Sequence, residues 1–230
     1  SRGFRFSEEY DGWWMTTRYK ALLHYAGANF VPPGSRIVTG IPLHIFGSQR
    51  AQHQISDVFR KALKAPAVAV LPQGFGALCL AISTNSALAQ GRVALVDIGS
   101  RTTELICFSD GQYLNHESAG VVLGVGQVYT QVAQKLSSQH QRQIDAYEVD
   151  WALREDKPIK IKGGVVERQA LEALVQHYVR PLATRLHNEM TRLWKEGAPG
   201  IDHLLYCGGG SALLASHLGH FRDDYTILPE

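Results

Sequence analysis

The sequence predicts an α/β protein in which helices cover mainly β sheets. Segments of strand length and segments with helical periodicity alternate along the whole chain. A β-hairpin lies near the middle, where an apolar run ends at Asp97, a Gly/Ser/Thr turn follows, and a second alternating strand reaches the turn Asp110-Gly111. Apolar residues make up 45% of the 230 residues, which permits a full hydrophobic core.

The part of the chain before this hairpin predicts three helices and two strands. Apolar residues at helical spacing predict a helix over 11–26, and Gly27 stands where that helix would stop. Ser48 is a typical N-cap residue for a second helix. The remaining elements are a strand over 35–42, a buried strand over 67–71 and a short small-residue helix over 75–82. We place a subdomain boundary just before the central strand, which divides the chain into 1–90 and 91–230.

The part after the hairpin turn continues the alternation. The longest periodic segment, 166–194, predicts a helix that Pro181 is expected to kink. The other expected elements are a strand over 112–118, a glycine-rich segment over 119–126 that enters a helix reaching about residue 136, a helix over 144–155, a strand over 158–161, a turn at 163–164, a strand over 201–207, a helix over 212–218 and a strand over 225–229.

Composition and charge exclude several classes of function. The formal net charge is only +2 and no basic run stands out, so direct nucleic-acid binding is not expected. No apolar run approaches the length of a membrane span. Cys79, Cys107 and Cys207 are far apart, each in an apolar segment, which is typical of small core residues in a reducing compartment. We therefore expect a cytoplasmic protein.

The polar loop of the central hairpin has the residue types that bind a nucleoside triphosphate. Gly99 lets the backbone come close to a ligand, while the hydroxyls of Ser100 and Thr102 and consecutive N–H groups can bind phosphate oxygens. Asp97 can hold a hydrated Mg²⁺. The same residues also fit an ordinary hairpin turn, and this loop alone leaves both interpretations open.

Two further segments favour the ligand interpretation. One strand ends in Leu71-Pro72-Gln73-Gly74, and another runs into 206–211, which reads Tyr-Cys-Gly-Gly-Gly-Ser and opens a helix. A strand followed by glycines and a helix places backbone next to a flat or anionic ligand at a helix N-terminus. The three segments are informative together because of their order and spacing.

These segments resemble the actin, heat-shock ATPase and sugar-kinase superfamily, and within it the bacterial actin-like proteins of the ParM type that segregate plasmids. The second phosphate loop of that superfamily, Asp-x-Gly-x-x-Thr-x-Asp, is matched by Asp97, Gly99 and Thr102, with Glu104 in place of the last Asp. The adenosine motif, a strand followed by glycines, is matched by the segment that ends in Gly208, Gly209, Gly210 and Ser211. The phrase over 39–43, Thr-Gly-Ile-Pro-Leu, is similar to a ParM-type strand and turn.

The resemblance implies an actin-like, ribonuclease H-like fold of two subdomains with a nucleotide cleft between them. It assigns Mg²⁺ binding through water to Asp97 and orientation of the attacking water to Gln73. The residues that it assigns to ATP or GTP are Gly99, Ser100, Arg101, Thr102, Gly124, Arg154, Glu155, Gly208, Gly209, Gly210 and Ser211. Among them, Arg154 and Glu155 would face the ribose, and Arg101 either contacts phosphate or points to solvent. The superfamily's first phosphate hairpin and last connecting segment have no match, so the fold is expected to lack that hairpin.

The function implied by the resemblance is that of a filament-forming protein with a slow Mg²⁺-dependent ATPase activity where the full nucleotide site is present. Its expected partners are further copies of itself, joined head to tail, and an adaptor protein that links the filament to plasmid or other mobile DNA. Two alternatives stay open: a non-polymerising nucleotide-binding scaffold that recruits partners, and a small-molecule kinase of the same superfamily. Light scattering with and without ATP separates the first two, and acceptor-dependent ADP formation would reveal the third.

Overall fold

The computed structural model describes residues 12–229 of the chain. The chain divides into two compact units, of which the first ends at Phe75 and the second begins at Gly76. Each unit has its own hydrophobic core. The subdomain boundary expected at residue 90 stays a prediction about the family fold.

The first unit is built on a two-stranded parallel sheet of β1 (Ile37–Ile41) and β2 (Val68–Pro72). Its helical elements are η1 (Trp13–Met15), α1 (Thr17–Asn29), α2 (Leu43–Phe46) and α3 (Gln49–Leu63). The core of the unit gathers side chains from all of these except β2, which contributes partly buried residues. Trp14, Ile41, Ile55 and Phe59 are among its buried residues.

The expected helix over 11–26 is divided in the structure. Trp13–Met15 forms a short 3₁₀ turn, and the α-helix begins only after Thr16, whose hydroxyl accepts a hydrogen bond from the Tyr19 amide at 3.2 Å. Asp11, the first residue of the prediction, lies outside the described residues. The apolar residues on both sides of Thr16 continue the same pattern, so periodicity alone did not reveal that the α-helix begins after this capping residue. The four-residue helix α2 was not predicted, because it is too short to show a period.

The N-terminus of α3 offers a simple test of the first unit. The Ser48 hydroxyl accepts a hydrogen bond from the Ala51 amide at 3.3 Å and so satisfies one of the free N–H groups at the start of the helix. Replacing Ser48 with alanine is expected to lower the free energy of unfolding by about 1 kcal/mol. Urea unfolding followed by circular dichroism measures this, with Ser48→Asp as the control that keeps an acceptor. An unchanged transition in Ser48→Ala would contradict the capping role.

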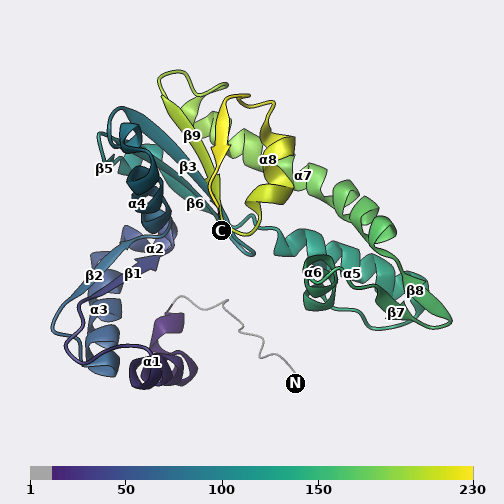
Figure 1. The fold of residues 1–230 in the computed structure, drawn as a ribbon, viewed down its shortest axis with the longest axis horizontal. Coiled ribbons are helices and arrows are strands. Elements are labelled where there is room, and N and C mark those ends of the chain that lie inside the picture. Colours follow the sequence, from purple (N-terminus) through teal and green to yellow (C-terminus); the bar gives the residue numbers. More distant parts are fainter. Residues whose placement is uncertain (1–11, 230) are drawn as a thin grey trace. The chain divides into compact units, whose positions relative to one another are not determined.

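The second unit contains a six-stranded mixed sheet (Figure 1). Its strands are β3 (Arg92–Ile98), β4 (Thr103–Ser109), β5 (Gln112–Tyr113), β6 (Ala119–Val121), β9 (His203–Cys207) and β10 (Tyr225–Ile227). The order is β10-β9-β3-β4-β5, and β6 also pairs with β4. Strands β10, β9 and β3 are parallel, whereas β4 is antiparallel to β3, β5 and β6. The carboxyl ends of the three parallel strands β10, β9 and β3 therefore lie at one edge of the sheet.

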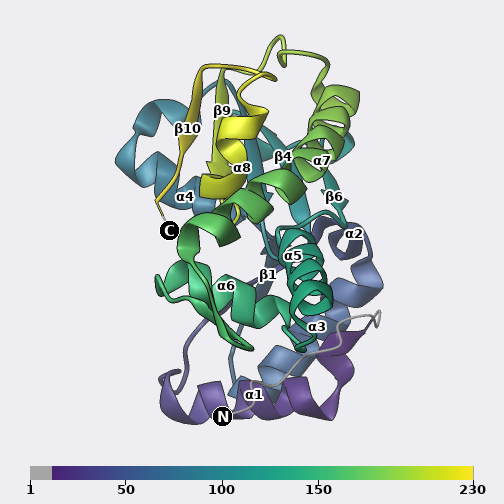
Figure 2. The same cartoon turned by 90° about the vertical axis from the view of Figure 1, so that its right-hand side faces the viewer.

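The helices of the second unit are longer than its strands. They are α4 (Phe75–Thr84), which starts at the junction, α5 (Gly126–His140), α6 (Ala146–Arg154), α7 (Arg168–Trp194) and α8 (Ser211–Leu218), together with the 3₁₀ turns η2 (Ser86–Ala89) and η3 (Asn115–Glu117). One face of the sheet, which includes Ala94, Val96 and Ile98, packs in a single core with residues of α5, α7 and α8. Figure 2 shows α5, α7 and α8 gathered on this side of the sheet. Pro181 lies inside α7 without ending it.

Three expectations for the second unit differ in part from the structure. The strand expected over 112–118 has only two residues, because the chain then turns through η3 before it returns as β6. The turn at Gly163 is confirmed, with φ of 83°, but it joins β7 (Ile159–Ile161) to an unpredicted strand, β8 (Gly164–Val166). Cys79 is exposed, while Cys107 and Cys207 are buried as expected. Most neighbours of Cys79 in the small-residue helix α4 are apolar, so the sequence did not show that Cys79 lies on the exposed face of this helix.

Candidate functional site

The predicted phosphate loop and the predicted adenosine motif meet at one edge of the second unit's sheet. The loop over 99–102 joins β3 to β4, and Gly208 follows directly after β9. Strands β3 and β9 are parallel, and Asp97 lies opposite Cys207. The residues that follow the two strands therefore lie at the same edge of the sheet. Asp97 is also opposite Glu104 on β4. Residues at the ends of β4 and β9 therefore flank Asp97 on β3.

Two glycines of the adenosine motif are required by close packing against β3. A Cβ atom on Gly208 would lie 2.5 Å from Asp97 Oδ1 and 2.6 Å from the Ile98 carbonyl oxygen, and the φ of Gly208 is 81°. A Cβ atom on Gly210 would lie 2.5 Å from a methyl group of Ile98. The Gly210 amide donates to the Ile98 carbonyl at 2.9 Å. Gly209 between them is exposed.

The glycine-rich segment before α5 packs against the loop from another direction. A Cβ atom on Gly124 would lie 2.5 Å from the backbone of Ser100, and one on Gly126 would lie 2.7 Å from the Ser100 carbonyl oxygen. The amides of Val125 and Gly126 donate to the carbonyls of Gly99 and Ser100 at 3.1 and 2.8 Å. Gly124 therefore supports the loop itself, and the nucleotide contact that the resemblance assigns to it stays a prediction.

These contacts fix the loop while leaving donors available. The Gly99 amide donates to the Thr102 carbonyl at 2.9 Å, and the Thr103 hydroxyl donates to the Leu123 carbonyl at 2.6 Å. The amides of Ser100 and Thr102 donate to no other backbone group among residues 12–229. In addition, α5 and α8 both begin beside the loop, where their N-terminal ends carry partial positive charge. This arrangement suits an anion with several oxygens.

The environment of Asp97 sets its charge state. Burial at the sheet edge raises the pKa of this carboxyl, and a hydrogen bond from the Cys207 thiol partly offsets that increase. Burial, followed by the nearby Asp97 charge, also raises the pKa of Cys207. The carboxylate form is thus costly without a cation, and a divalent cation at this edge would restore its preference for the ionised form. An acidic oxygen ligand at a strand end fits Mg²⁺.

Glu104 stands where the superfamily pattern has its last Asp. It is 1% exposed and lies directly across the hairpin from Asp97. The position of the superfamily's last Asp is thus occupied by a buried acidic residue on the strand next to Asp97.

The other predicted site residues lie on different elements. Gln73 is exposed in the first unit, and its amide donates to the Ile41 carbonyl at 2.8 Å. Arg154 and Glu155 lie at the C-terminal end of α6, which packs against α5 and α7. Arg154 is exposed and forms an ion pair with Asp150. Arg101 is exposed at the tip of the loop. The roles assigned to these four residues stay predictions.

Sequence reasoning missed two residues of the site. Gly126 lies in the glycine-rich segment expected over 119–126, but its contact with Ser100 depends on how α5 meets the hairpin. Cys207 was taken as a core residue, which it is, yet its position opposite Asp97 follows from the parallel register of β3 and β9. A register between strands that are 110 residues apart leaves no local signal in the sequence.

Comparison with known structures agrees with this architecture. The chain is similar to a pCBH ParM non-polymerisable mutant, with a TM-score of 0.75 and 20% identity over 96% of this chain and 73% of the other. It is similar to an archaeal actin homologue, Ta0583, in complex with ADP, with a TM-score of 0.69 and 18% identity over 94% and 72% of the two chains. It is also similar to MreB 5 of Spiroplasma citri bound to AMPPNP, with a TM-score of 0.68 and 14% identity over 91% and 69%. The fold is therefore that of an actin-like protein.

The sequence places the chain in a particular family of that class. The family described as archaeal actin homologue MreB-like, C-terminal, matches residues 95–220, which is more than half of the chain. The chain belongs to this family. The match begins inside β3 and ends after α8, so it includes both the loop and the glycine motif.

Two other comparisons are brief. A search of curated proteins finds no match to the sequence. Within residues 12–229, none of the helices combines the length and the apolar composition that crossing a membrane requires.

Proposed function

We propose that this chain is an actin-like protein that binds ATP or GTP with Mg²⁺ and assembles into filaments, in a cycle driven by nucleotide binding and slow hydrolysis. The observation that carries the proposal is the convergence of the loop over 99–102, the Gly208–Gly210 turn and the N-terminal ends of α5 and α8 at one sheet edge beside Asp97. The backbone donors suit phosphate oxygens, and the Asp97 carboxylate, whose ionised form is disfavoured by burial, suits a divalent cation.

In this proposal each residue of the edge has a distinct task. The amides and hydroxyls of Ser100 and Thr102 bind phosphate oxygens, and Gly208, Gly209 and Gly210 let the nucleoside approach the backbone. Asp97 holds the cation through water, and the cation supplies neutralisation of phosphate charge. Phosphoryl transfer to water needs mainly positioning and charge neutralisation, so Gln73 would orient the water without acting as a base.

The proposed biological role is the one that the resemblance to plasmid-segregating actin-like proteins implies. We propose that the filaments segregate plasmid or other mobile DNA through an adaptor protein rather than by direct nucleic-acid contact. The near-neutral charge balance supports the need for an adaptor. One of the similar solved structures is a 15-stranded ParM filament from Clostridium botulinum, with a TM-score of 0.74 and 19% identity over 96% of this chain and 71% of the other. That likeness supports self-assembly as the mode of action.

The test combines nucleotide binding with assembly. Equilibrium binding of a fluorescent ATP analogue and of a fluorescent GTP analogue is measured with and without Mg²⁺, and light scattering is then measured with ATP, GTP and ADP. The proposal expects saturable Mg²⁺-dependent binding and a triphosphate-dependent increase in scattering. Binding without scattering would identify a non-polymerising scaffold. Absence of binding to either nucleotide would refute the nucleotide site.

The hydrogen bond between Cys207 and Asp97 gives a pH-dependent prediction. Because the Cys207 thiol lowers the pKa of Asp97, its loss in Cys207→Ala should raise that pKa further. Mg²⁺ needs the ionised carboxylate, so binding falls as the pH falls through the pKa of Asp97. Mg²⁺-dependent nucleotide binding should therefore be lost at a higher pH in Cys207→Ala than in the unmodified protein.

The matched control is Cys207→Ser, which keeps a hydrogen-bond donor of similar size. Fluorescent nucleotide binding titrated downward from neutral pH measures the midpoint in all three proteins. If Cys207→Ala has the same midpoint as Cys207→Ser, the thiol does not tune the carboxyl group.

A further inference from the structure

The near-neutral formal charge of the chain is the sum of two unequal parts. Residues 12–75, the described part of the first unit, contain seven lysines and arginines and one acidic residue, Asp57. Residues 76–230 contain 14 lysines and arginines and 17 acidic residues. Residues 1–11 add two basic and three acidic residues, so the first unit as a whole stays basic. A strong local excess of one sign of charge favours a partner of the opposite sign.

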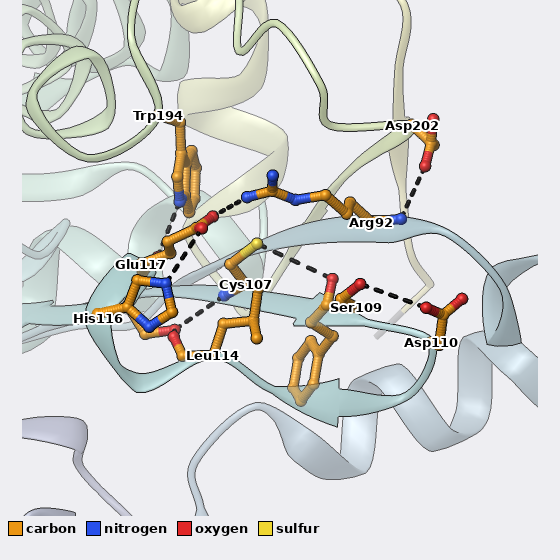
Figure 3. A network of polar contacts seen from close by, with 11 residues as sticks. Arg92, Cys107, Ser109, Asp110, Leu114, His116, Glu117, Trp194 and Asp202 are labelled. Carbon is orange, nitrogen blue, oxygen red and sulfur yellow. Dashed lines mark hydrogen bonds and ion pairs between the residues drawn. The ribbon is translucent and has the colours of Figure 1, made fainter.

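The cations of the second unit are largely neutralised within that unit. Figure 3 shows one case, in which the Arg92 guanidinium forms an ion pair with Glu117, whose carbonyl oxygen accepts a hydrogen bond from the Trp194 indole at 2.9 Å. The other arginines of this unit that pair with a carboxylate are Arg142, Arg154, Arg168, Arg192 and Arg222. The first unit has one carboxylate among residues 12–75 and cannot neutralise its cations in the same way.

A groove in the first unit lies between α1 and α3. Its volume is about 350 Å³, and all of its lining residues belong to η1, α1 and α3. The two helices pack against each other, and the ring centroids of Tyr19 and Phe59 are 6.2 Å apart. The apolar side chains of the lining are Met15, Val58 and Ala62. The walls of the groove are therefore held by helices that share one core.

Cations from both helices line the same groove. Lys20 and His24 are one turn apart on α1, and Lys61 is on α3. Within residues 12–229, neither lysine forms an ion pair with a carboxylate. The one carboxylate of the lining, Asp57, lies 3.8 Å from the Arg60 guanidinium on the same helix. The charged groups at the groove thus leave an excess of positive charge beside an apolar lining.

This combination favours an acidic peptide over other anionic partners. Ligand pockets have volumes of about 300 to 1,000 Å³, so a groove of about 350 Å³ accommodates side chains of a short segment. Nucleic acid would engage the lysines through phosphate oxygens and leave the apolar lining unfilled. A membrane would need apolar side chains that protrude, whereas Val58 is buried and Ala62 is half-buried. An acidic segment with a large apolar side chain uses both features of the groove.

We propose that the groove between α1 and α3 is a docking site for a short acidic, amphipathic segment of another protein. A large apolar side chain of that segment contacts Met15, Val58 and Ala62, and carboxylates on either side of it pair with Lys20 and Lys61. The apolar contact supplies most of the affinity, and the lysines supply selectivity for an acidic partner. None of the lining residues belongs to the proposed nucleotide site, so the docking site is a separate function of the chain.

The test begins with short random peptides that are displayed on phage and selected against the immobilised full chain. The expected consensus is a large apolar residue flanked by aspartate or glutamate. Selected peptides are then synthesised with a fluorescent label, and their affinity for the full chain in solution is measured by fluorescence anisotropy.

Two variants of the full chain test the two halves of the contact. Lys20→Glu with Lys61→Glu should weaken binding of the selected peptides about tenfold or more, because like charges then face the carboxylates. Met15→Gln keeps the length of the side chain but removes an apolar contact, and it should weaken binding about fivefold. The matched control is Arg36→Glu with Arg50→Glu, which makes the same charge change on exposed side chains of the first unit outside the groove. This control should bind the peptides nearly as the unmodified chain does.

Far-UV circular dichroism of each variant checks that the fold is kept, and Met15→Gln still tests the groove if charge reversal impairs folding. Selected peptides without acidic residues would overturn the proposal, as would equal affinity of the lysine variant and the control. Duplex DNA and vesicles with anionic lipid are titrated in parallel. Binding of either one that only the lysine variant loses, with no acidic peptide selected, would overturn the proposal and assign the groove to that partner instead.

Discussion

Gly208→Ala is expected to destabilise the second unit by about 3 kcal/mol and to abolish nucleotide binding. Gly208 has a φ of 81°, where an alanine is strained by about 1 to 2 kcal/mol. The new methyl group would also lie 2.5 Å from Asp97 Oδ1 and 2.6 Å from the Ile98 carbonyl oxygen. Relief of this overlap requires movement of the backbone, because the Ile98 carbonyl is held by the Gly210 amide at 2.9 Å.

Gly111→Ala is the matched control for backbone strain. Gly111 has a φ of 74°, close to that of Gly208, but a Cβ atom there would meet nothing within 4 Å. Its substitution should therefore cost only about 1 kcal/mol and leave nucleotide binding intact. Urea unfolding measures both free energies, and a fluorescent nucleotide measures binding. Equal losses of stability in the two variants would mean that the close approach to Asp97 does not constrain position 208.

The part of the fold that the sequence predicts best is the part with a regular apolar period. The β3–β4 hairpin was predicted correctly, because its apolar strands flank a loop of small polar residues and end at Asp110-Gly111, where both residues have positive φ. Helix α7 was predicted within two residues at its start and to the residue at its end. Strand β5 was predicted too long and β8 was not predicted, because two or three residues hold too few side chains to show alternation. The equally short β7 and β10 were predicted as strands, with their ends displaced by at most two residues.

The residue patterns alone predict the candidate site as separate segments, and only the family resemblance joins them into one nucleotide site. The motifs around Asp97 and Gly208 each carry a local signal, since glycines and small polar residues interrupt apolar strands there. Their meeting depends on the parallel pairing of β3 with β9, and the support of Ser100 by Gly126 depends on the packing of α5. Both are long-range contacts, whose residue types are also compatible with simple turns. The sequence alone therefore does not show that these segments meet.

Asp97→Asn is expected to change stability and nucleotide binding in opposite directions. The folded-state pKa of Asp97 is raised by burial, so the ionised carboxyl costs stability at neutral pH relative to the unfolded chain. Asparagine has nearly the same shape and no charge, so the variant should be at least as stable as the unmodified protein at neutral pH. This advantage should fade as the pH falls and Asp97 becomes protonated, since the native side chain is then neutral as well.

The same substitution should remove the effect of Mg²⁺ on nucleotide affinity. The unmodified protein should bind a fluorescent ATP analogue at least about tenfold more tightly with Mg²⁺ than with EDTA, a difference of about 1.4 kcal/mol. Asp97→Asn should bind equally weakly in both conditions. Asp57→Asn, an exposed carboxyl replaced in the first unit, should keep the full Mg²⁺ effect and unchanged stability. If Asp97→Asn is at least as stable as the unmodified protein but insensitive to Mg²⁺, the role of Asp97 is to bind a cation. A side chain whose role was to stabilise the fold would lower the stability when it is replaced.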